Sequence, residues 1–284
     1  MYEIAVISGK GGTGKTTLTL SMIPYFENLV IADCDVDAAD LKVILNDKIL
    51  EQKDFIGFQR PSIDYNKCIQ CGLCYRSCKF DAISEDIKIK ANSCEGCKVC
   101  EYVCPVDAIS MHDYVIGKVF KRDTKYGPMV DARLIPGEES SGKLVSEVRS
   151  QAIQVAADAN RNTILIDGSP GIACNVISTI TGVDKVITVT EPTVSGLHDL
   201  KKVIKLIQIF NIETLVVINK YDLSMKQTDL IEKYCEENNI KVALKIPFDE
   251  EIVHAISKLK IPSLTDVAFF KSGEWKSFIK QLKE

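Results

Sequence analysis

Short apolar runs alternate with amphipathic segments along most of the chain. The runs with the pattern of buried strands are EIAVIS near the N-terminus, LVIAD at residues 29–33, NTILIDG at 162–168, KVITVTE at 185–191 and TLVVINK at 214–220. Helical periodicity separates most of these runs, for example over residues 200–210. Buried strands that alternate with helices predict an α/β fold, in which crossover connections wind a mainly parallel sheet on both faces.

One segment, residues 57–117, breaks this rhythm. The buried-strand pattern stops there, and a C-x₂-C-x₂-C-x₃-C run occurs twice with a period of 26 residues. Its cysteines are Cys68, Cys71, Cys74 and Cys78, then Cys94, Cys97, Cys100 and Cys104. The repeat predicts a small twofold module in a surface connection, where an insertion costs little. We therefore expect one domain formed by residues 1–56 and 118–284, interrupted by an inserted domain at 57–117.

Composition and charge narrow the class of protein. The 284 residues are 46% hydrophobic, enough for a sizeable core, and the formal net charge of −4 provides no general field for nucleic acid. No apolar stretch approaches 18 residues and no basic leader precedes the first strand, so we expect a cytoplasmic protein without a membrane partner. Eleven cysteines in that compartment indicate metal or redox chemistry rather than disulfides.

The stretch SGKGGTGKTT, residues 8–17, carries the clearest chemical motif. Gly9-x₄-Gly14-Lys15-Thr16 is a complete P-loop pattern, placed after a predicted strand and before a predicted helix. Such glycines let backbone N–H groups surround phosphate oxygens at the positive end of a helix. In this motif the lysine, Lys15, reaches the β- and γ-phosphates and the hydroxyl of Thr16 binds Mg²⁺.

A second lysine, Lys10, makes this loop similar to the deviant Walker A motif of the MinD/ParA/Mrp and nitrogenase iron-protein class. The resemblance implies that Lys10 reaches the nucleotide of the partner subunit in a face-to-face dimer, either a homodimer or a heterodimer with a related ATPase. A second cation there offsets the charge that develops during phosphoryl transfer. The implied nucleotide-binding residues are Gly9, Gly11, Gly12, Thr13, Gly14, Lys15, Thr16, Thr17, Asn219 and Pro247.

Acidic residues follow two of the predicted strands. The resemblance implies that Asp35 positions or activates the attacking water, so that the catalytic group comprises Lys10, Lys15 and Asp35. It also implies that Asp33 supports Mg²⁺ through water and that Asp167 is the Walker B-like residue. The Mg²⁺ group is then Thr16, Asp33 and Asp167. The family commonly has D-x-P-P-G after this strand, and Ser169 is a departure from it.

The identity of the base rests on residues 219–222, Asn-Lys-Tyr-Asp. In GTPases the aspartate of N-K-x-D reads guanine, and Asp222 keeps GTP open. The MinD class also ends this strand with an asparagine, which there contacts adenine. Its second adenine-side loop is similar to Pro-Phe-Asp at residues 247–249. Because Lys10 decides the class, we favour ATP.

The cysteine runs match the bacterial two-cluster ferredoxin signature, in which three ligands of one run combine with the fourth of the other. The match implies two [4Fe–4S] clusters, in a small α+β ferredoxin domain. The implied ligands are Cys68, Cys71, Cys74 and Cys104 for one cluster, and Cys94, Cys97, Cys100 and Cys78 for the other. Zinc sites usually space their cysteine pairs well apart, unlike these runs. Lys79 replaces the usual proline after the fourth cysteine, a departure that affects the surroundings of the second cluster rather than its ligation.

Two further features need an interpretation. Cys174 follows Asp167 at the spacing of a cluster cysteine in the nitrogenase iron protein, but the second cysteine which that family needs is absent from residues 130–160. We interpret Cys174 as a buried small residue, with an extra thiol site as the alternative. Trp275, Phe278, Ile279 and Leu282 form a helical stripe. MinD proteins end in a membrane-targeting helix, yet a helix docked on the sheet is the commoner outcome.

Taken together, the sequence resembles MinD/Mrp-type P-loop ATPases that carry an inserted ferredoxin domain. The resemblance implies ATP or ADP, Mg²⁺ and two [4Fe–4S] clusters as cofactors, and a redox partner or a client metalloprotein. Our first hypothesis is an ATPase that couples its nucleotide state to the clusters during electron delivery or cluster assembly. The alternative is a positioning or scaffolding ATPase in which the clusters are structural or redox-sensing. A simple electron-carrying ferredoxin leaves the ATPase site unexplained.

Overall fold

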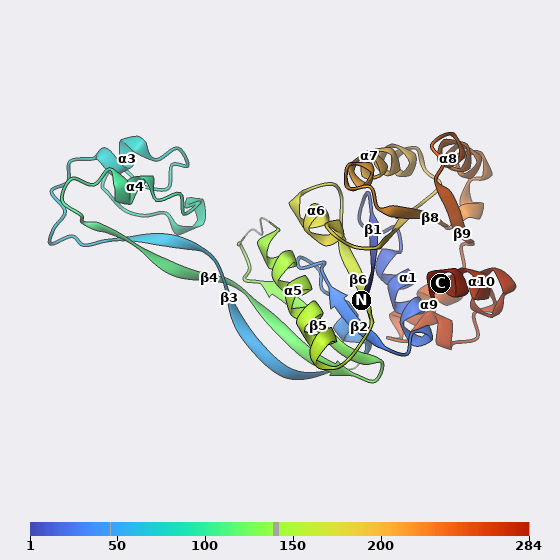
Figure 1. Cartoon of the computed structure of the whole chain (residues 1–284). Coiled ribbons are helices and arrows are strands. Elements are labelled where there is room, and N and C mark those ends of the chain that lie inside the picture. Colours follow the sequence, from blue (N-terminus) through green and yellow to red (C-terminus); the bar gives the residue numbers. More distant parts are fainter. Residues whose placement is uncertain (46, 139–141, 284) are drawn as a thin grey trace. The chain divides into compact units, whose positions relative to one another are not determined.

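The computed structural model describes residues 1–45, 47–138 and 142–283, and these residues divide into two compact units. The first, which we call the P-loop unit, comprises Met1–Gln52, Val119–Arg133 and residues 142–283. The second, the cysteine unit, comprises Lys53–Lys118 together with residues 134–138. The strands β3 and β4 continue from one unit into the other along the chain (Figure 1).

The strands form a sheet with the order β3-β4-β5-β2-β6-β1-β7-β8-β9. Their bounds are β1 (Tyr2–Ser8), β2 (Leu29–Asp33), β3 (Lys48–Ile63), β4 (Ile109–Thr124), β5 (Gly127–Leu134), β6 (Thr163–Pro170), β7 (Lys185–Thr190), β8 (Glu213–Asn219) and β9 (Lys241–Ile246). From β5 to β9 all neighbouring pairs are parallel. The predicted α/β fold with a mainly parallel sheet is therefore confirmed, and so are its five predicted strands.

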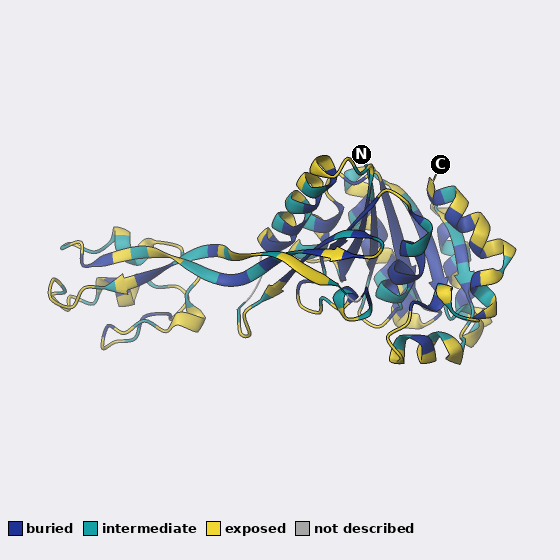
Figure 2. Cartoon of the chain, turned by 90° about the horizontal axis from the view of Figure 1, so that it is seen from below, coloured by how far each residue is buried: buried dark blue, intermediate teal, exposed yellow. Residues whose placement is uncertain are grey.

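Helices cover both faces of this sheet in the P-loop unit, and the buried strands lie between them (Figures 1 and 2). Alternate strand residues such as Ile4, Leu165 and Val217 share one apolar cluster with α1 and α10, while α5, α6 and α7 lie along the other face. The helix bounds are α1 (Lys15–Met22), α2 (Leu41–Leu45), α3 (Leu73–Ser77), α4 (Val99–Tyr102), α5 (Lys143–Asp158), α6 (Cys174–Ile180), α7 (Val194–Phe210), α8 (Met225–Glu237), α9 (Glu250–Ser257) and α10 (Gly273–Lys283).

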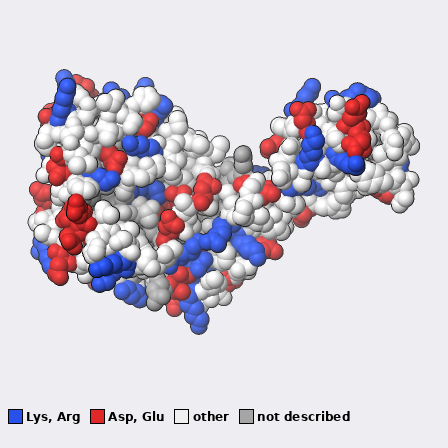
Figure 3. Space-filling model, turned by 180° about the vertical axis from the view of Figure 1, so that it is seen from behind, with Lys and Arg blue, Asp and Glu red and all other residues white. Residues whose placement is uncertain are grey.

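The C-terminal helix α10 is docked, as the sequence pattern predicted. Trp275 and Leu282 are fully buried, and the indole ring of Trp275 meets Phe270 edge to face at 4.8 Å between centroids. None of the described helices is long and apolar enough to cross a membrane. Lysine and arginine are interspersed with aspartate and glutamate on the face shown in Figure 3.

The 26-residue sequence repeat is also a structural repeat within the cysteine unit. Positive φ angles occur at three pairs of positions 26 residues apart: Gln70 and Gly96, Gly72 and Lys98, and Asp81 and Asp107. The backbone N–H of Ala82 donates to Cys78 Sγ at 3.3 Å, and that of Ala108 donates to Cys104 Sγ at 3.2 Å. Each cysteine run therefore folds in the same way, as a loop that leads into a short helix, α3 or α4.

Candidate functional site

The predicted phosphate-binding loop connects β1 to α1, which begins at Lys15. Gly14, the residue before α1, has φ +91°, and a Cβ there would lie 2.2 Å from Asn219 Nδ2. Only glycine combines this backbone conformation with so close a neighbour. The loop thus turns at the carboxyl end of a central parallel strand, where ligands of open α/β sheets commonly bind.

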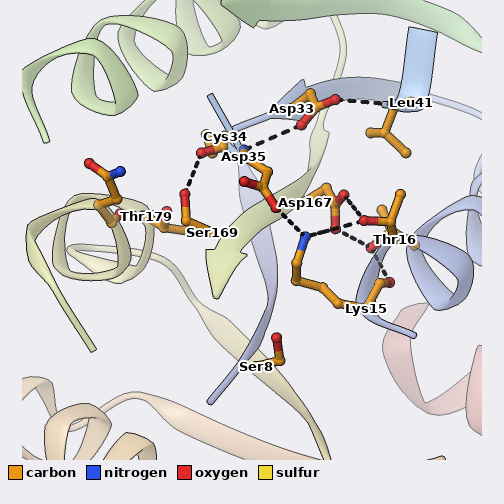
Figure 4. Close-up of polar contacts among 12 residues, drawn as sticks. Ser8, Lys15, Thr16, Asp33, Cys34, Asp35, Leu41, Asp167, Ser169 and Thr179 are labelled. Atoms are coloured by element: carbon orange, nitrogen blue, oxygen red, sulfur yellow. Dashed lines mark hydrogen bonds and ion pairs between the residues drawn. The ribbon is translucent and has the colours of Figure 1, made fainter. Parts of the chain in front are cut away.

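Lys15 lies at the centre of a buried polar network (Figure 4). Its Nζ donates to Asp167 Oδ1 at 3.0 Å and is 3.4 Å from Asp35 Oδ2. The hydroxyl of Thr16 donates to Asp167 Oδ2 at 2.7 Å. The structure therefore brings together four of the predicted residues, which come from the start of α1, from β6 and from the segment after β2.

Electrostatics at this network favour a bound cation or a proton. Burial lowers the pKa of Lys15, but the attraction of Asp167 and Asp35 outweighs it, so that this pKa lies above its usual value. Burial raises the pKa of Asp35 despite the nearby charge of Lys15. The site therefore holds more negative charge than Lys15 alone balances comfortably, a condition that suits a divalent cation.

Asp33 is fully buried and occupies the middle of a row of three aspartates. It is paired in register with Asp167 on β6 and with Asp131 on β5. Its carboxylate accepts from the backbone N–H groups of Leu41 at 3.2 Å and Asp35 at 3.3 Å, but has no direct contact with Thr16. Burial, together with the charge of Asp167, raises the pKa of Asp33 well above its usual value.

Lys10 lies apart from this network. Its Nζ donates to Ser195 Oγ at 3.2 Å and is 3.7 Å from Glu191 Oε2, and a third of its side chain remains exposed. Glu191 also accepts from Lys220 at 2.6 Å. The described contacts of Lys10 thus direct it away from the Lys15 network of its own chain.

A cavity of about 230 Å³ adjoins the phosphate-binding loop, and Gly12 and Gly14 of the loop are among the residues that line it. Asn219 lines it and donates from Nδ2 to the carbonyl oxygen of Thr13 at 2.8 Å. The remaining lining residues include Thr17, Pro247, Phe248, Ile252 and Ile256. Asp222 does not line this cavity, and its carboxylate accepts from the backbone N–H of Phe248 at 2.7 Å. The cavity therefore combines apolar side chains with a few polar groups, as cavities that bind small molecules commonly do.

The cysteines of the two runs line two separate cavities of the cysteine unit. One cavity is lined by Cys68, Cys71, Cys74 and Cys104, and the other is lined by Cys78, Cys94, Cys97 and Cys100. Each cavity thus receives three cysteines from one run and the fourth from the other. No group of three or more described His, Cys, Asp or Glu side chains is placed to hold a single metal ion.

The thiol chemistry of this arrangement fits a cubic cluster better than one ion. Each thiolate of a [4Fe–4S] cluster binds a different iron, so the four ligands need not converge on one point. The paired N–H donors to Cys78 and Cys104 Sγ, described above, point at the two cysteines that cross between the runs. Such donors tune a cluster through its sulfur ligands.

Cys174 is exposed at the first residue of α6, so its interpretation as a buried small residue is wrong. The helix turns Val176, Thr179 and Ile180 inward, and its first residue is left at the surface. Cys34 and Cys235, in contrast, are buried. The alternative of an extra thiol site at Cys174 stays a prediction.

Several site residues carry no motif and were missed. Thr19, one helical turn after Lys15, donates to Asp167 Oδ1 at 3.0 Å, and that spacing could have identified it. Ser169, the departure from the family pattern, donates to the carbonyl oxygen of Cys34 at 2.8 Å and so ties β6 to the Asp35 segment. Glu191 and Ser195, the partners of Lys10, follow β7 and have no signal beyond their place after a strand.

The comparisons with known proteins agree with this geometry. A family model described as "CobQ/CobB/MinD/ParA nucleotide binding domain" matches residues 4–262, and the chain belongs to this family of MinD/ParA-type P-loop ATPases. It is 35% identical over 264 residues to the uncharacterized protein MJ0578 of Methanocaldococcus jannaschii, covering 90% of this chain and 88% of that protein.

Solved structures share the fold. The septum site-determining protein MinD of Pyrococcus horikoshii, complexed with Mg-ADP, superposes with a TM-score of 0.56 at 18% identity, over 99% of this chain and 94% of that one. A Cyanothece McdA(D38A)–ATP complex gives a TM-score of 0.58 at 14% identity, over 100% and 96% of the two chains. These likenesses establish an α/β P-loop NTPase fold.

Proposed function

We propose that this protein is an Mg²⁺-dependent, dimeric ATPase that couples its nucleotide state to two [4Fe–4S] clusters, in electron delivery or in the assembly of a metal cluster in another protein. The observation that carries the proposal is the coexistence of two complete constellations in one chain. One is the network of Lys15, Thr16 and Asp167, and the other is the pair of cavities that four cysteines each line.

The chain's own groups assign the roles in hydrolysis. Lys15 binds the β- and γ-phosphates, and the hydroxyl of Thr16 holds Mg²⁺, as their positions in a P-loop require. Asp167 accepts from both residues and so keeps them oriented before nucleotide arrives. Asp35, which is 3.4 Å from Lys15 Nζ, orients the attacking water, and Asp33 supports Mg²⁺ through water.

Dimerisation supplies the second cation. Within its own chain Lys10 contacts Glu191 and Ser195 instead of the phosphate site, and its partial exposure leaves it free to reach a partner. A homodimer, or a heterodimer with a related ATPase, would therefore bring Lys10 to the nucleotide across the interface. Isolated subunits would turn over slowly, because the transition-state charge lacks this cation.

ATP is the favoured nucleotide. The cavity beside the loop is lined by Asn219 and Pro247, among others, and these are the two residues that the family resemblance assigns to adenine. Asp222, which would have to read guanine, is engaged by the N–H of Phe248 and lies outside that lining. These contacts support a structural role for Asp222, as a brace of the loop after β9.

A substitution of Asp222 separates the two nucleotides. Asp222→Asn should weaken ATP and GTP binding alike, by about two- to tenfold, because a neutral amide oxygen replaces the charged acceptor of the Phe248 N–H. Equilibrium titration with both nucleotides gives this ratio. A selective loss of GTP affinity, with a gain for xanthosine triphosphate, would contradict the ATP assignment, because it would mean that Asp222 reads the base.

The clusters would be held by the two sets of cysteines that share a cavity. The swapped sets match the ligand arrangement of bacterial two-cluster ferredoxins. When bound, such clusters supply one-electron chemistry at low potential. The chain contributes the thiolates, N–H donors to Cys78 and Cys104, and the apolar side chains of Ile83, Ile87 and Ile109, which pack against several of the cysteines.

The second candidate is a positioning or scaffolding ATPase in which the clusters are structural or redox-sensing. Its support is the fold, since the named neighbours include the septum site-determining MinD and McdA. This alternative predicts nucleotide-dependent association with a partner or surface, and cluster properties that do not depend on nucleotide.

Thermodynamic linkage separates the two candidates. If nucleotide changes the free energy of reduction, reduction must change the affinity for nucleotide by the same factor. We expect the affinity for Mg-ATP, or for a nonhydrolysable analogue, to differ by about tenfold between the oxidised and the dithionite-reduced protein. Anaerobic equilibrium titration measures this ratio. Equal affinities, with both clusters loaded, would favour the positioning ATPase.

A further inference from the structure

The row of buried aspartates continues beyond the nucleotide site. Asp167, Asp33 and Asp131 lie side by side on β6, β2 and β5, and each is almost fully buried. Lys15 and Thr16 hold the first, and backbone N–H groups hold the second. Asp131 has no role in the proposed hydrolysis. Because it is a carboxylate buried outside the nucleotide site, it needs a partner that compensates its charge.

Arg122, on β4, is the partner of Asp131. Its guanidinium binds both oxygens of Asp131, through Nε to Oδ1 and through Nη2 to Oδ2 at 3.2 Å. Its remaining nitrogen, Nη1, donates to Asp47 Oδ2 at 2.5 Å. Asp131 is fully buried and Arg122 is 7% exposed, so this is a desolvated pair in which the loss of one partner is costly.

The same network holds the helix α2 at both ends. At its start, the N–H of Leu41 donates to Asp33, and Lys42 Nζ is 3.6 Å from Asp131 Oδ2. Shortly after its end, Asp47 binds Arg122. Since α2 follows the segment that contains Asp33 and Asp35, a movement of that segment on nucleotide binding acts on both attachments.

The strands β3 and β4 connect this network to the cysteine unit along the chain. β3 begins at Lys48, directly after Asp47, and β4 carries Arg122 two residues before its end at Thr124. Along the chain, β3 passes from the P-loop unit into the cysteine unit, and β4 returns from the cysteine unit to the P-loop unit. Arg122 therefore joins the residue before β3 to the last residues of β4, beside a helix that contacts Asp33.

We infer that Arg122, held between Asp131 and Asp47, is a positioning residue that transmits the state of the nucleotide site to the ends of β3 and β4 and hence to the cysteine unit. The inference rests on the proposed function, because that function gives the transmission its purpose. The contacts that it invokes all lie around α2 and the ends of β3 and β4. It states that nucleotide-induced movement of α2 reaches these strands through the contact between Asp47 and Arg122.

Asp47→Asn tests the inference with little risk to the fold. It preserves side-chain size and leaves the buried Arg122–Asp131 pair intact. Arg122→Lys is the second variant, since it keeps the charge beside Asp131 but lacks the planar fork that binds Asp131 through two nitrogens and Asp47 through the third. Lys121→Gln is the matched control, because it removes an ion pair between the same two strands, Lys121 to Glu51 at 3.1 Å, without touching α2.

Hydrogen exchange with and without Mg-ADP gives the readout. In the wild type and in Lys121→Gln, nucleotide should slow exchange about tenfold or more in residues 34–45, and also in 48–52 and 119–124. In Asp47→Asn, where a neutral oxygen replaces the charged acceptor of Arg122 Nη1, and in Arg122→Lys, the slowing over 34–45 should remain, while that over 48–52 and 119–124 decreases several-fold; Asp47→Glu, which keeps the carboxylate, should retain it. The inference is overturned if these strands respond equally in Asp47→Asn, or do not respond in the wild type.

Failure of the proposed function has a different signature. If the reduction potential of the loaded wild type is the same with and without nucleotide, the coupling to the clusters is absent, whatever the exchange pattern. If the potential shifts in the wild type and shifts equally in Asp47→Asn, the coupling exists but does not pass through Arg122, and the inference alone fails.

Discussion

The P-loop unit and the cysteine unit of this chain are stabilised in different ways. In the P-loop unit a large apolar cluster runs from Ile4 on the central strand to Leu282 on the last helix. In the cysteine unit the buried cluster consists of Cys74, Ile83, Ile87 and Ile109, with further cysteines packed against it. A core that small rarely stabilises a fold without a metal or disulfides. One unit thus folds by burying apolar surface, whereas under the proposed function the other would depend on the clusters that its cysteines hold.

The largest expected effect is the loss of structure in the cysteine unit when a ligand is removed. Cys74→Ser should release about half of the bound iron and destabilise this unit, while the P-loop unit keeps its thermal transition. Iron analysis and hydrogen exchange on the anaerobically purified protein measure both effects. Cys174→Ser is the matched control: this cysteine is exposed outside the two cavities and should retain all of the iron. Full iron content in Cys74→Ser would contradict the assignment.

The reverse experiment removes apolar packing from the P-loop unit. Trp275 is fully buried among Tyr25, Phe270 and Phe278, and Trp275→Ala should lower the free energy of unfolding of this unit by about 3–5 kcal/mol. The iron content should not change. Tyr102→Ala is the control, because this ring in the cysteine unit is 92% exposed, and its removal should cost less than about 0.5 kcal/mol. Denaturant titration distinguishes the two.

The third prediction concerns the dimer of P-loop units. Lys10→Ala and Asp35→Asn should each reduce ATP hydrolysis by about 100-fold or more, because each removes one charged group from the transition state. An equal mixture should recover roughly a quarter of wild-type activity, because half of the dimers are mixed and each of those holds one complete site. If the mixture stays inactive, Lys10 acts within its own chain and the trans assignment is wrong.

The smallest effect is a pH dependence that the buried carboxylates give to the P-loop unit. Burial raises the pKa of Asp33 in the folded protein, so the fold favours its protonated form. The stability that this group contributes is therefore present in acid, below about pH 4, and is lost as the pH rises through the raised pKa. In Mg²⁺-free protein at pH 8, Asp33→Asn should increase the free energy of unfolding by about 1–3 kcal/mol. The gain should shrink toward pH 4.

The matched control for this titration is Asp37→Asn, since Asp37 lies in the same segment but is exposed. It should change the free energy of unfolding by less than about 0.5 kcal/mol at either pH. A lower stability of Asp33→Asn at pH 8 would contradict the argument, because it would mean that the N–H groups of Leu41 and Asp35 outweigh the cost of burial.

The two units also differ in how much of them could be predicted from sequence. Five strands of the P-loop unit are mostly buried runs rich in apolar residues, and the motif at Gly9–Thr16 occurs in the place where such a sheet binds phosphate. The strands β3 and β4 escaped prediction because they are long and partly exposed, so polar residues such as Lys53 and Lys121 interrupt their apolar positions. No cysteine or repeat marks residues 134–138, which join the cysteine unit through the N–H of Ile135, bonded to the carbonyl oxygen of Ile116, and through the ion pair of Glu138 with Arg60.

Side-chain contacts between distant segments were the other limit. The sequence identifies Lys15 and Asp167 because each follows a motif or a strand end, but not Arg122, which is separated by 75 residues from its partner Asp47. Cys174 was misjudged because its burial depends on how α6 rotates against the sheet, which spacing to Asp167 does not determine. Both cases require the fold before the residue acquires a meaning.

The central claim is that the nucleotide bound by the P-loop unit changes the free energy of reduction of the clusters in the cysteine unit. An anaerobic redox titration of the purified protein, followed by electron paramagnetic resonance, tests it most directly when it is repeated without nucleotide, with Mg-ADP and with Mg-ATP. We predict a midpoint shift of about 60 mV or more between nucleotide states, equivalent to a tenfold linkage per electron. Superimposable curves with both clusters fully loaded would contradict the account and leave an ATPase whose clusters serve as structure or as a sensor.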